Sequence, residues 1–181
     1  MRRTLTAVLA LAAALALALT ADASAPCDPG ASAFDTCQVG GDADDIQVGT
    51  AGDDFQYGAA GNDTQRGGAG NDTQRGGRGN DRQRGGPGND TQRGGPGNDR
   101  QSGAPGNDLM SGGSGHDVLH GGDGLDVESG GRGRDALYGG KGNDALSGGA
   151  GNDVVFARDG TRDRVNCGGG RRDTVYADRK D

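Results

Sequence analysis

The chain has 181 residues, of which 40 are glycine, and hydrophobic residues make up 30% and aromatic residues 3% of the total. It carries 19 basic and 26 acidic residues, which gives a net charge of −7. This composition excludes an ordinary globular core and resembles that of a disordered chain, and the length leaves no room for a catalytic domain beside the repeats, so we expect no enzyme.

Residues 1–23 have the features of a secretory signal peptide. Arg2 and Arg3 precede a run rich in alanine and leucine from Leu5 to Leu19, and small residues follow. The apolar run is shorter than the ~20 residues needed to cross a bilayer. We therefore expect no membrane span and a secreted, extracellular protein.

Residues 24–39 form an N-terminal segment that contains two of the three cysteines. Cys27 and Cys37 are the favoured disulfide in an oxidising compartment, and the odd count leaves Cys167 unpaired. For so short a loop the chain-entropy model gives a stabilisation of roughly 2–3 kcal/mol.

Residues 40–156 consist of a nine-residue repeat. An aspartate recurs at every ninth position from Asp45 to Asp153, within the pattern Gly-Gly-x-Gly-x-Asp-x-u-x, in which u is the position for a large aliphatic residue. An exact short period over this length predicts a stacked solenoid, in which each unit contacts only its neighbours.

The repeat offers hard oxygen ligands and no regular nitrogen or sulfur. Glycines permit tight turns that leave backbone carbonyls free, and each aspartate adds an anionic oxygen. Such ligands suit Ca²⁺, which takes 6–8 oxygens at about 2.3–2.6 Å. One turn supplies too few of them, so two turns are expected to share each ion, and folding is expected to require the ion.

Units such as 112–119 and 148–155 resemble the RTX, or hemolysin-type, calcium-binding repeats. The resemblance implies an all-β fold, a right-handed parallel β-roll solenoid of short strands and glycine-rich turns, with Ca²⁺ as the cofactor. It also implies that each aspartate pairs with the one two repeats later. The metal ligands expected on this basis are Asp54, Asp63, Asp72, Asp81, Asp90, Asp99, Asp108, Asp117, Asp126, Asp135, Asp144 and Asp153.

The position two residues after the aspartate departs from the family pattern throughout the N-terminal half and once in the C-terminal half. It should hold a large aliphatic residue, but seven units have glutamine and one has Glu128. A buried amide without partners costs on the order of 1–3 kcal/mol. Either the glutamines stack into hydrogen-bonded ladders or the N-terminal half is a weakly ordered array, and the sequence favours neither alternative.

Residues 157–181 are expected to cap the C-terminal end. The period changes there, because Asp153, Asp163 and Asp173 are ten residues apart, and valines alternate with polar residues, which predicts two more short strands. A capping segment closes the open end of a solenoid.

The partners expected from the sequence are calcium ions and, as an option, a cell-surface polysaccharide. Arginines that follow the glutamines predict a regular outward stripe, but without interleaved aromatic residues nucleic-acid binding is not expected. A solvated ladder that balances the aspartates is the favoured interpretation of this stripe, which comprises Arg66, Arg75, Arg84 and Arg93.

The function expected is that of a secreted calcium-binding repeat protein that folds on binding Ca²⁺. The alternative is an adhesin-like or ice-binding surface on the same scaffold. Ice binding needs flat ladders of threonine and asparagine, and only the asparagines recur.

Overall fold

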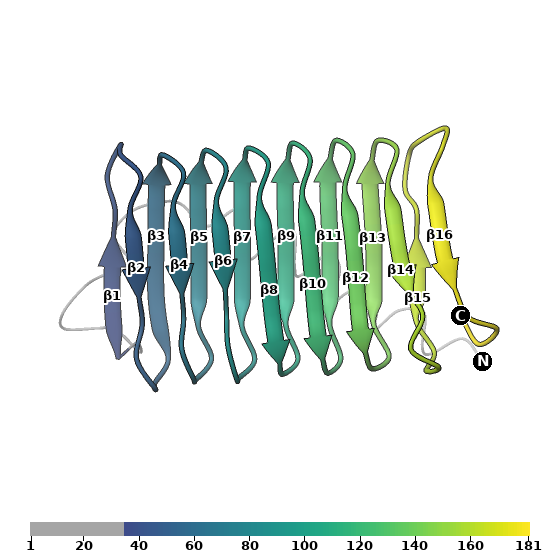
Figure 1. Cartoon of the computed structure of the whole chain (residues 1–181), viewed down its shortest axis with the longest axis horizontal. Helices are drawn as coiled ribbons and strands as arrows, with labels where there is room; N and C mark the ends of the chain where they lie inside the picture. Colours follow the sequence, from purple (N-terminus) through teal and green to yellow (C-terminus); the bar gives the residue numbers. More distant parts are fainter. Residues whose placement is uncertain (1–34) are drawn as a thin grey trace, which may run out of the picture.

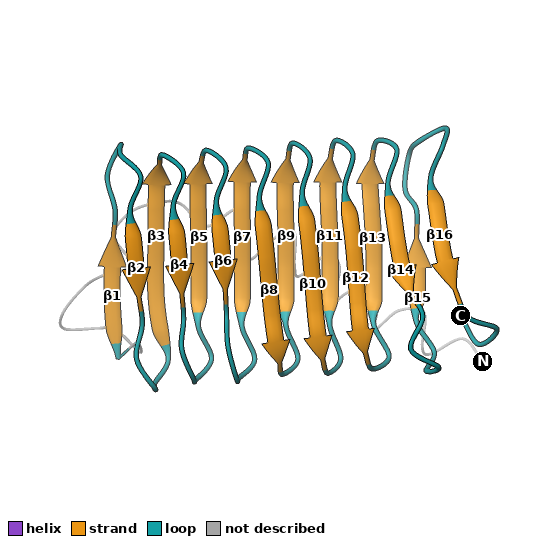
Figure 2. Ribbon diagram, viewed as in Figure 1, coloured by secondary structure: helices purple, strands orange, loops and turns teal. Residues whose placement is uncertain are grey.

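The computed structural model describes residues 35–181, and within them every regular element is a β-strand. The strands form two parallel sheets of eight, shown in Figures 1 and 2. The odd sheet contains β1 (Thr36–Val39), β3 (Asp54–Ala60), β5 (Thr73–Arg78), β7 (Thr91–Pro96), β9 (Leu109–Ser114), β11 (Val127–Arg132), β13 (Ala145–Ala150) and β15 (Arg164–Asn166). The even sheet contains β2 (Ile46–Val48), β4 (Thr64–Arg66), β6 (Arg82–Arg84), β8 (Arg100–Pro105), β10 (Val118–Asp123), β12 (Ala136–Lys141), β14 (Val154–Ala157) and β16 (Thr174–Ala177).

The chain alternates between the two sheets, so two nine-residue repeats complete one turn of the solenoid. Neighbouring strands of a sheet are therefore two repeats apart, as in the pairing of Leu119 with Leu137. In Figure 1 the odd strands rise behind and the even strands descend in front as the chain advances, which is a right-handed winding. The predicted right-handed parallel β-roll is confirmed.

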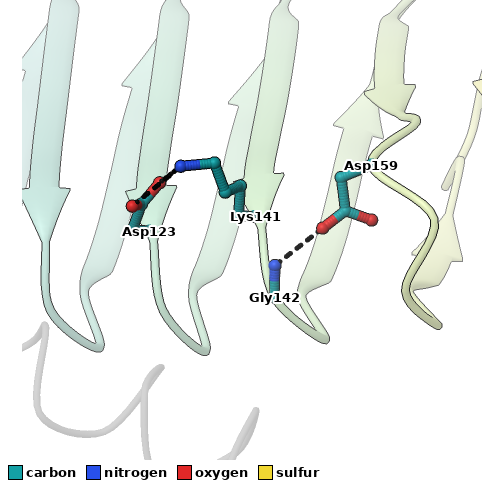
Figure 3. A network of polar contacts seen from close by, with 4 residues as sticks. All are labelled: Asp123, Lys141, Gly142 and Asp159. Atoms are coloured by element: carbon teal, nitrogen blue, oxygen red, sulfur yellow. Dashed lines mark hydrogen bonds and ion pairs between the residues drawn. The ribbon is translucent and has the colours of Figure 1, made fainter.

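The final turn of the solenoid is longer than the others. Ala145 pairs with Arg164 and Val154 with Thr174, so each of these pairings spans more than two repeats. In the turn before it, at the same edge of the solenoid, the N–H of the equivalent glycine donates to a backbone carbonyl, as Gly124 does to Lys141. Gly142 instead donates to the side-chain Oδ2 of Asp159 at 2.8 Å (Figure 3). The carboxylate of Asp159 therefore replaces the backbone carbonyl as the acceptor for this glycine N–H in the longer turn.

The apolar core cluster lies in the C-terminal half. Side chains alternate in and out along each strand, and the position two residues after the aspartate points between the sheets. In this half it is filled by fully buried aliphatic side chains, which touch across the two sheets: Met110, Leu119, Leu137, Leu146 and Val155.

The glutamines of the N-terminal half form two continuous ladders. In the even sheet Nε2 of Gln83 donates to Oε1 of Gln65 at 2.7 Å, and in the odd sheet Gln74 donates to Gln56 at 2.8 Å. Four of the glutamines from Gln56 to Gln92 use Nε2 a second time, on a carbonyl ten residues later, as Gln56 does on Arg66, and Gln47 makes this bond alone. The ladder alternative is therefore the one that the structure adopts, and each bond contributes about 0.5–1.5 kcal/mol.

The ladders end where the apolar core begins. Oε1 of Gln92 and of Gln101 has no hydrogen-bond partner within residues 35–181, because the next positions along the axis are Met110 and Leu119. Two unpaired amide oxygens are thus the cost of joining a polar interior to an apolar one.

Glu128 is the position in the apolar core that fits it least. The side chain is 1% exposed, stacks between Met110 and Leu146, and has no hydrogen-bond partner for either carboxyl oxygen among the described residues. Burial raises its pKa to about 8. We expect Glu128→Leu to raise the free energy of unfolding by about 1–3 kcal/mol, because it removes a desolvated acid and continues the leucine packing.

Guanidinium unfolding of the calcium-loaded protein measures this change. Leu137→Glu is the matched control on the facing sheet, and it should lower stability by a comparable or larger amount. A Glu128→Leu variant less stable than the wild type would mean that the acid has a favourable partner in solution.

The predictions for the two ends of the chain concern the disulfide, the signal peptide and the C-terminal cap. Cys37 is disulfide-bonded and Cys167 is free, while the proposed partner Cys27 and the signal peptide at residues 1–23 lie outside the described residues. No helix within residues 35–181 is long and apolar enough to span a bilayer. Residues 157–181 supply β15 and β16, which lie at the ends of the two sheets.

Candidate calcium-binding turns

Two rows of aspartates run along the solenoid, one at each edge where the chain crosses between the sheets. Within a row the backbone N–H of each aspartate donates to Oδ1 of the next, at 2.8 Å from Asp99 to Asp117 and 2.9 Å from Asp117 to Asp135. The first row comprises Asp45, Asp63, Asp81, Asp99, Asp117, Asp135, Asp153 and Asp173. The second comprises Asp54, Asp72, Asp90, Asp108, Asp126, Asp144, Asp163 and Asp181.

The rows confirm that aspartates two repeats apart lie in stacked turns. The 12 carboxylates predicted as ligands are each at most 2% exposed. Carboxylates are rarely buried to this extent unless they are paired or bind a metal. Each row of buried carboxylates would therefore be destabilised if all its members were ionised without a bound cation.

The second oxygen of these carboxylates has no partner. Oδ1 accepts the neighbouring N–H, but Oδ2 is buried and accepts no hydrogen bond from any described residue in Asp63, Asp72, Asp81, Asp90, Asp99, Asp108, Asp117, Asp126, Asp135, Asp144, Asp153 and Asp163. A buried unpaired carboxylate oxygen that recurs in twelve successive turns indicates a place for a positive partner.

Glycine leaves the space beside each of these oxygens open. A Cβ built on Gly112 would stand 2.4 Å from Oδ2 of Asp117 and 2.7 Å from the carbonyl oxygen of Gly130 in the next turn. The same arrangement recurs at Gly121, where the distances to Oδ2 of Asp126 and the carbonyl of Gly139 are 2.3 and 2.4 Å. Any side chain at these glycines would fill the space where the two oxygens converge.

Side chains alone do not complete a metal site in the described part of the chain. No group of three or more His, Cys, Asp or Glu side chains there could hold an ion. The remaining oxygens must come from main-chain carbonyls of the glycine turns, as the convergence at Gly112 illustrates. A donor set of carboxylate and carbonyl oxygens in flexible turns is the kind that Ca²⁺ prefers.

The electrostatics agree with this interpretation. Burial raises the pKa of Asp90, Asp99 and Asp117 to about 7, and neighbouring carboxylates add to the effect while the backbone N–H partly offsets it. The pKa is raised to about 6 for the same first cause in Asp72, Asp81, Asp108, Asp126, Asp135 and Asp144. Without a cation these turns hold their negative charge poorly.

Asp54 and Asp163 differ from the prediction in opposite ways. Both oxygens of Asp54 accept hydrogen bonds, Oδ1 from Thr36 at 2.8 Å and Oδ2 from the N–H of Thr50, so no orphan oxygen marks a site there. Asp163 was not among the expected ligands, yet it is 4% exposed and has an orphan Oδ2. The sequence signal that could have identified Asp163 is the valine two residues after it, at the position of the inward-facing aliphatic residue.

A second ladder beside the aspartates uses the preceding residue of each repeat. Oδ1 of Asn62 accepts the N–H of Asn80 at 2.9 Å, and Oδ1 of Asn80 accepts the N–H of Asn98 at 2.8 Å. Each of these amide oxygens has one of its two acceptor positions taken by the next turn. The ladder thus counts against the ice-binding alternative.

The comparison with protein families agrees with this geometry. The model of the RTX calcium-binding nonapeptide repeat matches residues 39–74, 57–92, 66–101, 93–128 and 129–161, which together cover more than half of the chain. No curated protein matches closely enough for comparison. By its repeats, its roll and its buried aspartate rows, the chain belongs to the RTX family of calcium-binding nonapeptide-repeat proteins.

Proposed function

We propose that this protein is secreted, binds Ca²⁺ between stacked turns, and acquires its folded form outside the cell on doing so. The observation that carries the proposal is the repeated orphan Oδ2, buried beside an open glycine. A bound divalent cation would supply the positive charge that no described side chain provides. The proposed ligands are the expected aspartates, with Asp163 added and Asp54 the least supported.

Within each turn the chain has separate groups for holding the stack and for holding the ion. Oδ1 of Asp117 accepts the N–H of Asp99 and so fixes the spacing of the two turns. Oδ2 of the same residue is left for the ion, together with the carbonyl of Gly130. This division supports sharing of each ion between turns that are two repeats apart.

Secretion is supported by residues 1–23 and by the affinity expected of such sites. Extracellular calcium modules bind at about 10⁻⁴–10⁻³ M, which suits a protein that folds on leaving the cell. The proposed role is binding rather than catalysis, because the buried aspartates are engaged in the ladder and held in identical turns.

Calorimetric titration with Ca²⁺ tests the sites directly. We expect Asp117→Asn to lower the number of bound ions by about two, because one charge would be lost from the sites shared with Asp99 and with Asp135. The asparagine keeps an oxygen for the N–H of Asp99, so the stack itself should persist.

Asp123→Asn is the matched control. Asp123 loses the same charge but is exposed and pairs with Lys141 at 3.0 Å on the surface (Figure 3). The number of calcium ions bound by the Asp123→Asn variant should equal that of the wild type. A loss of a single ion in Asp117→Asn would show that each turn binds alone, and no loss would remove the aspartate from the site.

A further inference from the structure

The outer surface of the even sheet carries an ordered column of side chains. The column lies at the position after each inward-facing residue, and the strand register places its members one above the next along the solenoid axis. Its members are, in order, Arg66, Arg84, Ser102, His120, Tyr138, Phe156 and Tyr176.

The C-terminal part of this column is a continuous ring stack. The centroids of His120 and Tyr138 are 4.3 Å apart, those of Tyr138 and Phe156 are 4.4 Å apart, and those of Phe156 and Tyr176 are 4.8 Å apart. Interior rings of such a stack have both faces covered. The face of His120 that points toward Ser102 has no ring against it, because serine is the next member.

The N-terminal part of the same surface is cationic. Arg66 pairs in register with Arg84, and Arg82 with Arg100, so four guanidinium groups project from three neighbouring strands. Strands β4, β6 and β8 contain no acidic residue. None of these four arginines forms an ion pair with a described carboxylate.

The stripe predicted from the sequence is in fact divided between two surfaces. Arg66 and Arg84 lie on the even sheet, and Arg75 and Arg93 lie on the odd sheet. The charge density is greatest on the even sheet, because Arg82 and Arg100 add to it.

Ser102 creates a recess where the two parts meet. A hollow of about 250 Å³ is lined by Arg84, Arg100, Ser102 and His120, among others, and its walls are almost wholly apolar, which suits the ring of a sugar, so an acid group would meet the guanidinium groups at its mouth. Adjacent strands are about 4.8 Å apart, so the positions of Arg84 and His120 are separated by about two strand spacings. That separation accommodates one ring between the guanidinium and the imidazole.

We propose that this recess binds an acidic sugar of a polysaccharide, with a carboxylate or sulfate as the charged group. The apolar face of the pyranose would lie on the free face of His120, and the acid would accept hydrogen bonds from Arg84 and Arg100. Guanidinium groups bind such planar or tetrahedral anions with two parallel bonds. Further acids along the polymer would meet Arg66 and Arg82.

A polysaccharide fits this surface better than a nucleic acid does. Single-stranded nucleic acids bind by stacking successive bases on separate aromatic faces. Here one ring face is free, and beyond it the cationic positions hold arginine only. Repeated acids with a single stacked ring are the pattern of an acidic glycan.

This inference rests on the proposed function, because the arginines come into register only in the folded roll. Calcium in the turns would also offset the net charge of −7, which otherwise repels a polyanion. Binding should therefore require Ca²⁺.

Short galacturonate oligosaccharides and sulfated heparin oligosaccharides are the probes, with neutral dextran oligosaccharides as the negative control. Calorimetry with the full chain in Ca²⁺ should show binding of at least one acidic probe and none of dextran. Arg84→Ala should weaken it by about tenfold or more. Arg75→Ala makes the same charge change at the same repeat position of the odd sheet, and should weaken it by about twofold at most.

A second pair of variants tests the recess without changing charge. Ser102→Tyr extends the ring stack into the recess and should abolish binding, whereas Ser111→Tyr, at the same position of the next repeat on the odd sheet, should not. Circular dichroism of every sample establishes that it is folded. Binding by a roll that folds without Ca²⁺ would overturn the proposed calcium dependence and keep this site.

A folded wild type that binds neither acidic probe would overturn the inference and leave calcium binding intact. So would equal losses in Arg84→Ala and Arg75→Ala, undiminished binding in Ser102→Tyr, or tighter binding of single-stranded DNA than of either acidic probe.

Discussion

In EDTA at about pH 8 the chain is expected to lose most of its β-sheet signal in far-ultraviolet circular dichroism, and millimolar Ca²⁺ is expected to restore it cooperatively. The reason is a shortage of other stabilising contacts. Seven hydrophobic residues are buried in the described part of the chain, against 40 glycines in the sequence. Each glycine costs roughly 0.5–1 kcal/mol more than alanine to order in regular structure.

The pH dependence of the ion-free chain follows from the aspartate rows. In the folded state the pKa of Asp90, Asp99 and Asp117 is about 7, above the ordinary value of 3.8. Their contribution to stability is therefore fully present below pH 3.8 and is lost as pH rises through about 7. We expect loss of structure in EDTA to be more complete at about pH 8 than at about pH 5.

Mg²⁺ is the control ion for this experiment. It demands near-ideal octahedral geometry and gives up its water reluctantly, so turns built from carbonyls should respond weakly to it. An unchanged spectrum on adding Ca²⁺, or an equal response to Mg²⁺ at the same concentration, would contradict calcium-coupled folding.

The nine-residue period predicted a stacked solenoid, and the resemblance to RTX repeats supplied the β-roll and the stacking of aspartates two repeats apart. The solenoid follows from a local rule that each repeat obeys, namely a glycine turn, an aspartate and a short strand. The bond from the Asp99 N–H to the buried Asp117 follows once two repeats complete one turn, as the resemblance implied.

Other features depend on which side chains become neighbours in the stack. The glutamine ladders form because Gln65, Gln83 and Gln101 fall in one column, and the amide geometry that joins them is not encoded in any single repeat. Asp163 was not predicted as a metal ligand because extra residues in the last turn shift it out of the nine-residue period. The division of the arginines between two surfaces follows from the alternation of sheets, which the linear stripe conceals.

The fourth position of each repeat is where a single methyl group is expected to do most damage. Gly115 has φ +137°, and a Cβ there would lie 1.8 Å from the carbonyl oxygen of Gly97 in the preceding turn. Turns cannot move apart at this point without breaking the bond from the N–H of Gly97 to the carbonyl of Ser114, which is 2.8 Å long. We expect Gly115→Ala to cost about 4 kcal/mol or more of the free energy of unfolding.

The neighbouring second position of the repeat provides the control, since the chain itself has alanine there twice. A Cβ on Gly113 would stand 2.3 Å from the carbonyl oxygen of Gly95, but Ala59 and Ala104 occupy the same place with φ of 82° and 90°, so this part of the turn adapts to a side chain. Gly113→Ala should therefore cost only about 1–2 kcal/mol in the same calcium-loaded denaturation experiment. Similar losses in the two variants would mean that the shorter contact at the fourth position adds nothing to the strain of the turn; a larger loss in Gly115→Ala would identify contact between stacked turns as the constraint that favours glycine at this position.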